Sequence, residues 1–216
     1  MNKAIYKSLI LLVGAMFMAC QGGKGNAPSK EAESKETVKQ TEKVRNISLY
    51  LYDDFPVQKA QMLADAIKET YPSVSIQKEP LVLPKEHYNR ERKRYSGTGL
   101  LKDLSKLRKG NVVLGLTDEV IFKANELSST YGIFGVSTLG TYVAVISSTL
   151  PSGKQHSYDH LVKLMMHELG HSFGLNHCSN QHCFMVDAEH GNKFSQTPSF
   201  CNECKAFLNS KGWKIK

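Results

Sequence analysis

Three histidines and one glutamate lie close together in the chain, at a spacing that suits a zinc hydrolase. His167 and His171 are four residues apart. On a helix their side chains share one face and can bind one Zn²⁺ at about 2.0–2.1 Å each. Glu168 follows the first histidine and lies off that row, close enough to reach a water molecule on the metal. These residue types predict hydrolysis by a zinc-activated water, with Glu168 as the general base.

The segment that follows predicts a third metal ligand. Gly174 can end the helix in a left-handed conformation, after which the chain can turn and bring in His177. Three protein ligands leave the fourth position to water, as in a catalytic rather than a structural zinc site. A His-Glu-x-x-His pattern arises by chance in roughly one chain in fifty, whereas the longer pattern with Gly174 and His177 arises in roughly one in twenty thousand. A helix whose histidines stack by accident is the less favoured interpretation.

Four cysteines predict a second metal site beside the first. Cys178 follows His177 directly, and Cys183, Cys201 and Cys204 complete two close pairs. Four thiolates suit a closed, tetrahedral structural zinc site with Zn–S distances of about 2.3 Å. In an oxidising compartment the same four residues can instead form two disulfides, or the last two a redox pair. Sequence alone leaves these alternatives open.

The combined pattern resembles the archaemetzincin family of zinc peptidases. The matching residues are His167, Glu168, His171, Gly174, His177, Cys178, Cys183, Met185, Cys201 and Cys204. The resemblance implies a metzincin-like zincin fold, a methionine below the catalytic zinc, for which Met185 is the match, and an aminopeptidase-like action on peptides. It extends to the segments 114–118, 134–136 and 144–148 and so covers most of residues 47–204.

The first 45 residues are typical of an export signal followed by a tether. The basic residues Lys3 and Lys7 precede an apolar stretch that is too short to span a bilayer. That stretch ends at Cys20 in a pattern that resembles a bacterial lipoprotein signal. We therefore predict a signal peptide over 1–19, lipidation of Cys20, a flexible polar tether over 20–45 and a location in the bacterial cell envelope, anchored to a membrane. An ordinary cleaved signal with an incidental cysteine is the alternative.

The remaining residues, 46–216, predict one peptidase domain of the α/β (α+β) class with a mixed, mostly parallel twisted sheet, an active-site helix and a small Cys₄ zinc subsite. Apolar runs predict strands at 47–52, 74–76, 112–116, 131–138 and 142–147, and a further extended segment at 81–83. Helical periodicity predicts helices at 54–70 and 100–107, a zinc helix from Ser157 or Asp159 to Gly174, and a terminal helix or strap at 205–216. In metzincin-like folds an edge strand lies above the zinc, and a free edge can pair with an extended peptide. Our candidate for that edge is 131–138.

The charge pattern narrows the choice of partners. The chain has a formal net charge of +8, and two of these charges leave with the predicted signal. Basic residues are scattered apart from the run 88–95, which we predict to be a solvated loop leading into a helix rather than a phosphate or acidic-substrate site. The aromatic and basic interleaving of a nucleic-acid-binding module is missing. We therefore expect a peptide or protein substrate, a membrane contact through the lipid, no nucleic acid, and a monomer.

The sequence as a whole predicts a zinc metallopeptidase with two Zn²⁺ per chain, one catalytic and one structural. A second hypothesis is a zinc-binding or interaction lipoprotein that uses the same ligands but has a cleft too closed for peptides. Glu168 argues against that hypothesis, because metal binding alone does not require a carboxylate beside the first ligand.

Overall fold

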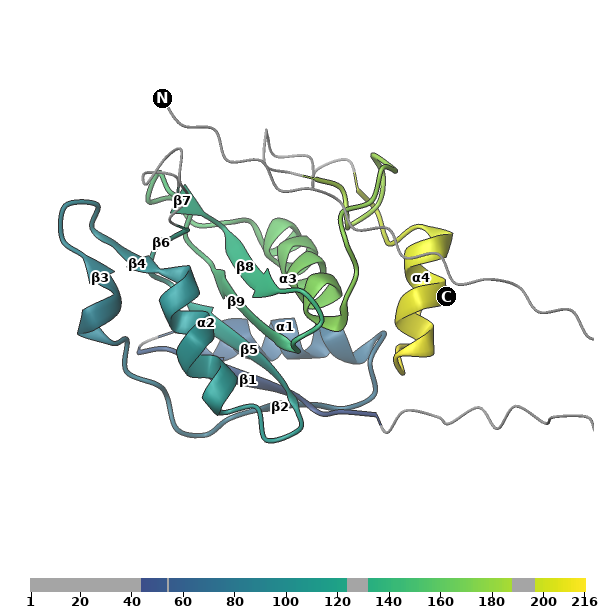
Figure 1. Cartoon of the computed structure of the whole chain (residues 1–216), viewed down its shortest axis with the longest axis horizontal. Coiled ribbons are helices and arrows are strands. Elements are labelled where there is room, and N and C mark those ends of the chain that lie inside the picture. The colour runs from purple at the N-terminus through teal and green to yellow at the C-terminus, as the bar shows by residue number, and fades with distance from the viewer. Residues whose placement is uncertain (1–43, 54, 124–131, 188–196) are drawn as a thin grey trace, which may run out of the picture. The chain divides into compact units, whose positions relative to one another are not determined.

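A five-stranded sheet forms the centre of the fold in the computed structural model, which describes residues 44–53, 55–123, 132–187 and 197–216 (Figure 1). The strands are ordered β2-β1-β5-β9-β8. The first four are parallel to one another, and the last is antiparallel to its neighbour. Their bounds are β1 Ile47–Leu51, β2 Val74–Ile76, β5 Val112–Thr117, β9 Val143–Ser147 and β8 Gly135–Thr138. This is the mixed, mostly parallel sheet that the sequence predicted.

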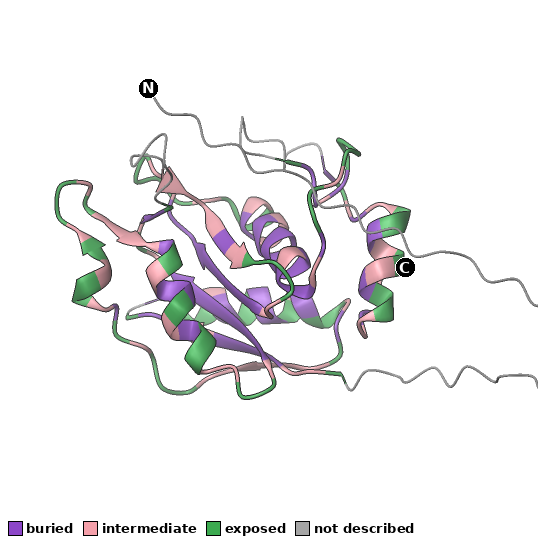
Figure 2. Cartoon of the chain, viewed as in Figure 1, coloured by how far each residue is buried: buried purple, intermediate pink, exposed green. Residues whose placement is uncertain are grey.

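Helices cover both faces of the sheet. Helices α1 (Val57–Lys68) and α3 (Tyr158–Phe173) pack on one face, and α2 (Gly97–Lys106) packs on the other. Because side chains alternate along a strand, Leu114 joins the first core and its neighbour Val113 the second. Figure 2 shows the result: α1 and α2 have exposed residues on their outer sides, whereas α3 is buried or intermediate along most of its length. Helices on both faces are the usual arrangement around parallel strands.

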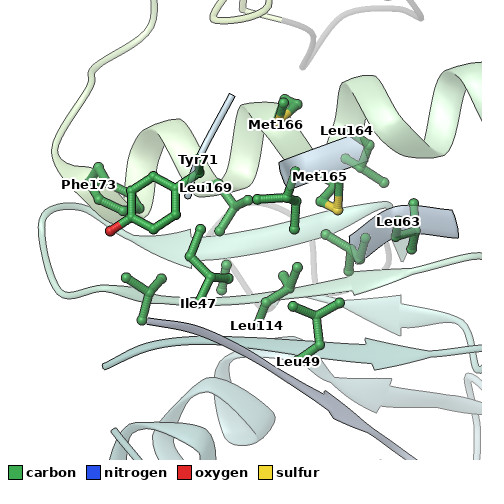
Figure 3. Close-up of a cluster of buried hydrophobic side chains, with 14 of the residues drawn as sticks. Ile47, Leu49, Leu63, Tyr71, Leu114, Leu164, Met165, Met166, Leu169 and Phe173 are labelled. Atoms are coloured by element: carbon green, nitrogen blue, oxygen red, sulfur yellow. The ribbon is translucent and has the colours of Figure 1, made fainter. Parts of the chain in front are cut away.

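The larger core fixes the inner face of α3. Leu114 from the sheet, Leu63 from α1, and Met165 and Leu169 from α3 meet there, and all four side chains are essentially inaccessible to solvent (Figure 3). Phe173 closes the end of the same row. The apolar row that periodicity predicted therefore faces the sheet, which turns the opposite side of α3 outward.

A second, smaller sheet corrects two predictions. Its strands are ordered β3-β4-β6-β7. Their bounds are β3 Tyr88–Asn89, β4 Arg94–Ser96, β6 Ile121–Phe122 and β7 Gly132–Ile133. The basic run 88–95 is therefore a hairpin and not a loop. The rings of Tyr88 and Tyr95 pack at 4.9 Å across it, and Tyr95 also pairs with Ile121. As predicted, the run leads directly into α2.

The predicted edge strand 131–138 is divided at Phe134. Gly132–Ile133 pairs with β6 in the small sheet, whereas Gly135–Thr138 forms the last strand of the main sheet as β8. The second half is thus the sheet edge that we expected, and the first half is not. Residue 131 lies outside the described residues. The extended segment expected at 81–83 contributes only one bridge, between Tyr52 and Leu81.

The C-terminal residues form both structures that were considered for them. Helix α4 (Asn202–Ser210) begins directly after Cys201, and the last residues then run back over the core. Trp213 is 3% exposed and packs against Tyr71 and Phe173. A short 3₁₀ turn, η1 (Lys85–His87), precedes the hairpin.

The predicted signal peptide, Cys20 and most of the tether lie outside the described residues. Within the ranges that the structure describes, no helix has the length and apolar composition needed to cross a bilayer.

Candidate active site

Local sequence fixes both ends of α3. Ser157 caps the first turn by accepting a hydrogen bond from the backbone N–H of His160, at 3.3 Å. At the other end Gly174 has a φ of 111°, and the N–H of Leu175 donates to the carbonyl of Gly170 at 2.9 Å. These are the marks of a glycine-terminated helix that reverses the chain. The reversal returns the chain toward the helix surface and delivers His177.

The three predicted histidines converge on one point. Their nearest ring nitrogens all lie within 4.8 Å of one another, and the Nε2 atoms of His167 and His171 are 3.0 Å apart. Three nitrogens bound tetrahedrally at about 2.1 Å from zinc lie about 3.4 Å from each other. The spacing and chemistry of His167, His171 and His177 therefore fit a zinc ion.

Backbone carbonyls orient two of the three rings. The Nδ1 atom of His167 lies 2.7 Å from the carbonyl oxygen of Phe184, and that of His171 lies 2.7 Å from the carbonyl oxygen of Leu175. A carbonyl can only accept, so both Nδ1 atoms carry the proton and both Nε2 lone pairs face the metal position. Burial, followed by the charge of His171, lowers the pKa of His167 to about 4. Burial also lowers the pKa of His171, and neutral rings are the form that binds metal.

His177 is the most accessible of the three histidines. Its side chain is 39% exposed, and its Nδ1 lies 3.8 Å from a carboxylate oxygen of Asp187. The ring is nevertheless close to both others, with centroids 5.4 Å from His167 and 4.8 Å from His171. The metal position therefore opens to solvent on the side of His177.

Met185, which the resemblance implies to lie below the zinc, packs against helix α3. Its side chain is fully buried, and a Cβ added at Gly170 would lie only 2.4 Å from the Met185 sulfur. Gly170, between the two helical histidines, therefore allows the methionine to approach. The motif alone does not predict this role for Gly170, although a glycine inside a helical pattern is a recognised sign of close packing.

Glu168 is held between the helix and the edge strand. It is 6% exposed, and its Oε2 accepts a hydrogen bond from the Ser137 hydroxyl at 2.6 Å. A Cβ at Gly135 would lie 2.7 Å from Cγ of Glu168. Burial raises the pKa of Glu168 to about 7, although the hydrogen bond from Ser137 acts in the opposite direction. Sequence reasoning missed Ser137 and Gly135, because neither belongs to a motif; their i, i+2 spacing on a predicted edge strand was the only available signal.

The four cysteines form the second predicted cluster. Their sulfur atoms all lie within 4.8 Å of one another, and those of Cys178 and Cys201 are 3.7 Å apart. A tetrahedron of thiolates about 2.3 Å from zinc has sulfurs about 3.8 Å apart, whereas a disulfide needs about 2.05 Å. All four are free thiols in the structure. The geometry therefore fits zinc and not the two-disulfide alternative.

Backbone groups support this cluster from two sides. The N–H groups of Met185 and Cys201 donate to the sulfur of Cys183 at 3.4 and 3.3 Å. Burial raises the pKa of Cys183 and, with the neighbouring thiols, that of Cys204. Four thiolates at such close quarters need a cation between them, because like charges out of water repel strongly. A zinc ion meets that need.

Comparison with known proteins agrees with this geometry. Residues 63–210, more than half of the chain, match the family described as peptidase family M54. The chain belongs to this family. The matched region contains both metal clusters, Glu168 and Met185.

Relatives from archaea support the assignment along most of the described chain. The archaemetzincin of Methanopyrus kandleri is 29% identical over 144 residues, which cover 66% of this chain and 81% of the relative. The archaemetzincin of Archaeoglobus fulgidus is 34% identical over 120 residues, which cover 54% and 70%. As an M54 protein, this chain is a zinc metallopeptidase that hydrolyses peptide bonds.

Solved structures show the same fold. The crystal structure of the Methanopyrus kandleri archaemetzincin matches with a TM-score of 0.64 at 26% identity, covering 78% of this chain and 95% of the other. A zinc-dependent peptidase from Methanocorpusculum labreanum matches with a TM-score of 0.63 at 22% identity, covering 76% and 100%. The predicted metzincin-like fold class is therefore confirmed.

His160 lies on the same helix as two of the clustered histidines but belongs to neither cluster. The ring of His160 packs against those of His156 and Phe134, with centroids at 4.4 and 5.8 Å. Cys20, the predicted lipidation site, lies outside the described residues.

Proposed function

We propose that His167, His171 and His177 hold the zinc ion of an M54 peptidase and that Glu168 is its general base. The observation that carries this proposal is the convergence of three oriented imidazoles beside one buried carboxylate. Zinc bound there would polarise the substrate carbonyl and acidify the attacking water. Glu168 accepts the proton of that water at its carboxylate and later passes it to the leaving amine. A carboxylate whose pKa lies near neutrality suits both transfers.

The substrate in this proposal is an extended peptide paired with β8. Ser147 donates its N–H to the carbonyl of Phe134 at 2.8 Å. Because hydrogen-bonded and non-hydrogen-bonded pairs alternate in antiparallel strands, the N–H and C=O groups of Gly135 and Ser137 then point away from β9. They face the free edge, where a peptide can add as a further strand. The edge lies directly beside Glu168.

Cleavage from the amino terminus is the working expectation, since the resemblance to archaemetzincins favours it. The test is to expose the purified, zinc-loaded protein to a diverse peptide library and identify the products by mass spectrometry. Products shortened from the amino terminus support aminopeptidase action, and internal cuts support an endopeptidase. If a folded protein with zinc at both clusters yields no product at all, the non-catalytic zinc-binding hypothesis replaces this one.

We further propose two zinc ions per chain, one in each cluster, of which the cysteine-bound ion is structural. The four-thiolate set offers no open position to water, whereas the histidine set does. Cys178 is covalently next to His177, so the two ions stabilise adjacent parts of one segment.

We also propose export and lipid anchoring at Cys20, on the basic, apolar and cysteine order of the first 20 residues and the polar tether that follows. Cys20→Ser should move the protein out of the membrane fraction. A variant that stays in that fraction at the wild-type level, together with an intact wild-type mass that lacks acyl chains, would reject the anchor.

A further inference from the structure

Strand β8 contacts Glu168 through two residues on the same face. Gly135 and Ser137 are two positions apart, so both face α3, whereas Val136 between them is buried in the core beneath α2. In the described part of the main sheet, β8 is the terminal strand. Gly135 and Ser137 are partly exposed. The residues that meet Glu168 are therefore the residues that border the free edge.

Ser137 fixes one oxygen of a side chain that would otherwise have several conformations. Its hydroxyl donates to Oε2 of Glu168 at 2.6 Å, a short distance typical of a hydrogen bond to a charged acceptor. The same carboxylate lies close against Gly135, because the position of a Cβ there would be only 2.9 Å from Oε1. Glu168 thus lies in a slot whose walls are α3 and the two β8 residues.

We propose that Ser137 is a positioning residue for Glu168, which links the carboxylate to the strand edge where the peptide binds. This inference rests on the proposed function. The backbone of Ser137 faces the free edge and its side chain binds Glu168. Ser137 therefore aligns Glu168 with the carbonyl of a peptide that pairs with β8.

Ser137→Ala tests the proposal by removing the hydroxyl alone. The loss of a hydrogen bond to a charged group should lower kcat by about 10- to 100-fold. KM should stay within about twofold, because backbone pairing at β8 does not need the hydroxyl. Ser137→Thr, which restores a hydroxyl, should recover most of kcat. Thr141→Ala is the matched control, since it removes a hydroxyl that donates to the Thr138 carbonyl in the turn after β8 and should leave kcat unchanged.

A double-mutant experiment distinguishes a positioning role of Ser137 from a general disturbance of the site. In a Glu168→Gln background, Ser137→Ala should cost little further activity, since residues that act through one another are not additive. Zinc content should be equal in all variants, and a crystal structure of Ser137→Ala should show the Glu168 carboxylate displaced or in several conformations. An equal loss of kcat in both backgrounds, or an unmoved carboxylate with full kcat, would overturn the proposal. Full activity of Glu168→Gln alone would instead reject the proposed function.

Discussion

Groups outside the His-Glu-x-x-His motif fix the tautomers and the orientations of the motif's side chains. The carbonyls of Phe184 and Leu175 fix the tautomers of His167 and His171, and the Ser137 hydroxyl donates a hydrogen bond to Glu168. The motif itself supplies only residue types and spacing. The surroundings decide whether an imidazole is neutral and where a carboxylate points.

A pH prediction concerns His156, which lies outside both metal clusters. Burial, followed by the charge of His160, lowers the pKa of His156 to about 4. Between about pH 6.5, the ordinary value, and about pH 4, the unfolded chain binds the proton more readily, so folding stability falls as the pH falls. His160, whose pKa burial also lowers, acts in the same direction, while Asp159 opposes and Lys163 reinforces its shift.

The measurement is the melting temperature of wild type and His156→Phe between pH 4 and pH 8. The histidines of the metal site are the same in both proteins, so the difference between the two melting curves reports on His156. We expect wild type to lose stability relative to the variant as the pH falls below about 6.5. Parallel curves across this range would contradict the assignment.

Among the elements, α3 is the one on which the site is built, and its last turn has a specific backbone requirement. Gly174 has a φ of 111°, a backbone angle that residues other than glycine rarely adopt. Gly174→Ala should therefore destabilise the fold by about 1–2 kcal/mol and also weaken zinc binding, because the same turn delivers His177. Melting temperature and zinc affinity are the two readouts.

Gly153→Ala provides the matched control for this prediction. Gly153 also has a positive φ, of 81°, but no atom lies within 4 Å of an added Cβ, and the residue belongs to neither metal cluster. The Gly153→Ala variant should be less stable than wild type but should bind zinc with the same affinity. If both variants affect zinc equally, the turn at Gly174 has no special role in placing His177.

The sequence predicted the elements whose patterns are long and missed those that depend on tertiary contacts. The apolar row of α3, its serine cap and its terminal glycine are local signals, and all three lie where we expected them. The two-residue strands β3, β6 and β7 carry too little pattern to be recognised. Ser137 and Gly135 meet Glu168 only after the sheet has formed, about 30 residues away in the chain. Motif residues could thus be predicted, but not the groups that orient them.

At the scale of the whole molecule, the cysteine cluster joins the C-terminal helix to the segment that follows α3. Cys178 and Cys183 follow the zinc helix, and Cys201 and Cys204 lie at the start of α4. A closed thiolate site contributes folding energy directly. Cys201→Ser should therefore lower the melting temperature and reduce zinc content to about one ion or fewer per chain, because His177 loses its support as well.

His171→Ala is the comparison for the cysteine variant. It should lose the histidine-bound ion, keep about one zinc per chain, and retain most of its thermal stability, since the core still supports α3. Elemental analysis and thermal unfolding distinguish the two variants. A wild type with a single zinc, and with thiols that stay unreactive after chelation and denaturation, would contradict the two-site arrangement and favour disulfides.

The central claim, that Glu168 moves the proton in zinc-dependent peptide hydrolysis, is tested most directly by the turnover of Glu168→Gln at unchanged zinc content. The amide keeps the size of the side chain and can still bond to Ser137, but it cannot accept the proton of the attacking water. We predict that kcat falls by about 10²–10⁴-fold while both clusters keep their zinc and the melting temperature stays near that of wild type. A zinc-loaded Glu168→Gln with nearly wild-type turnover would contradict the account.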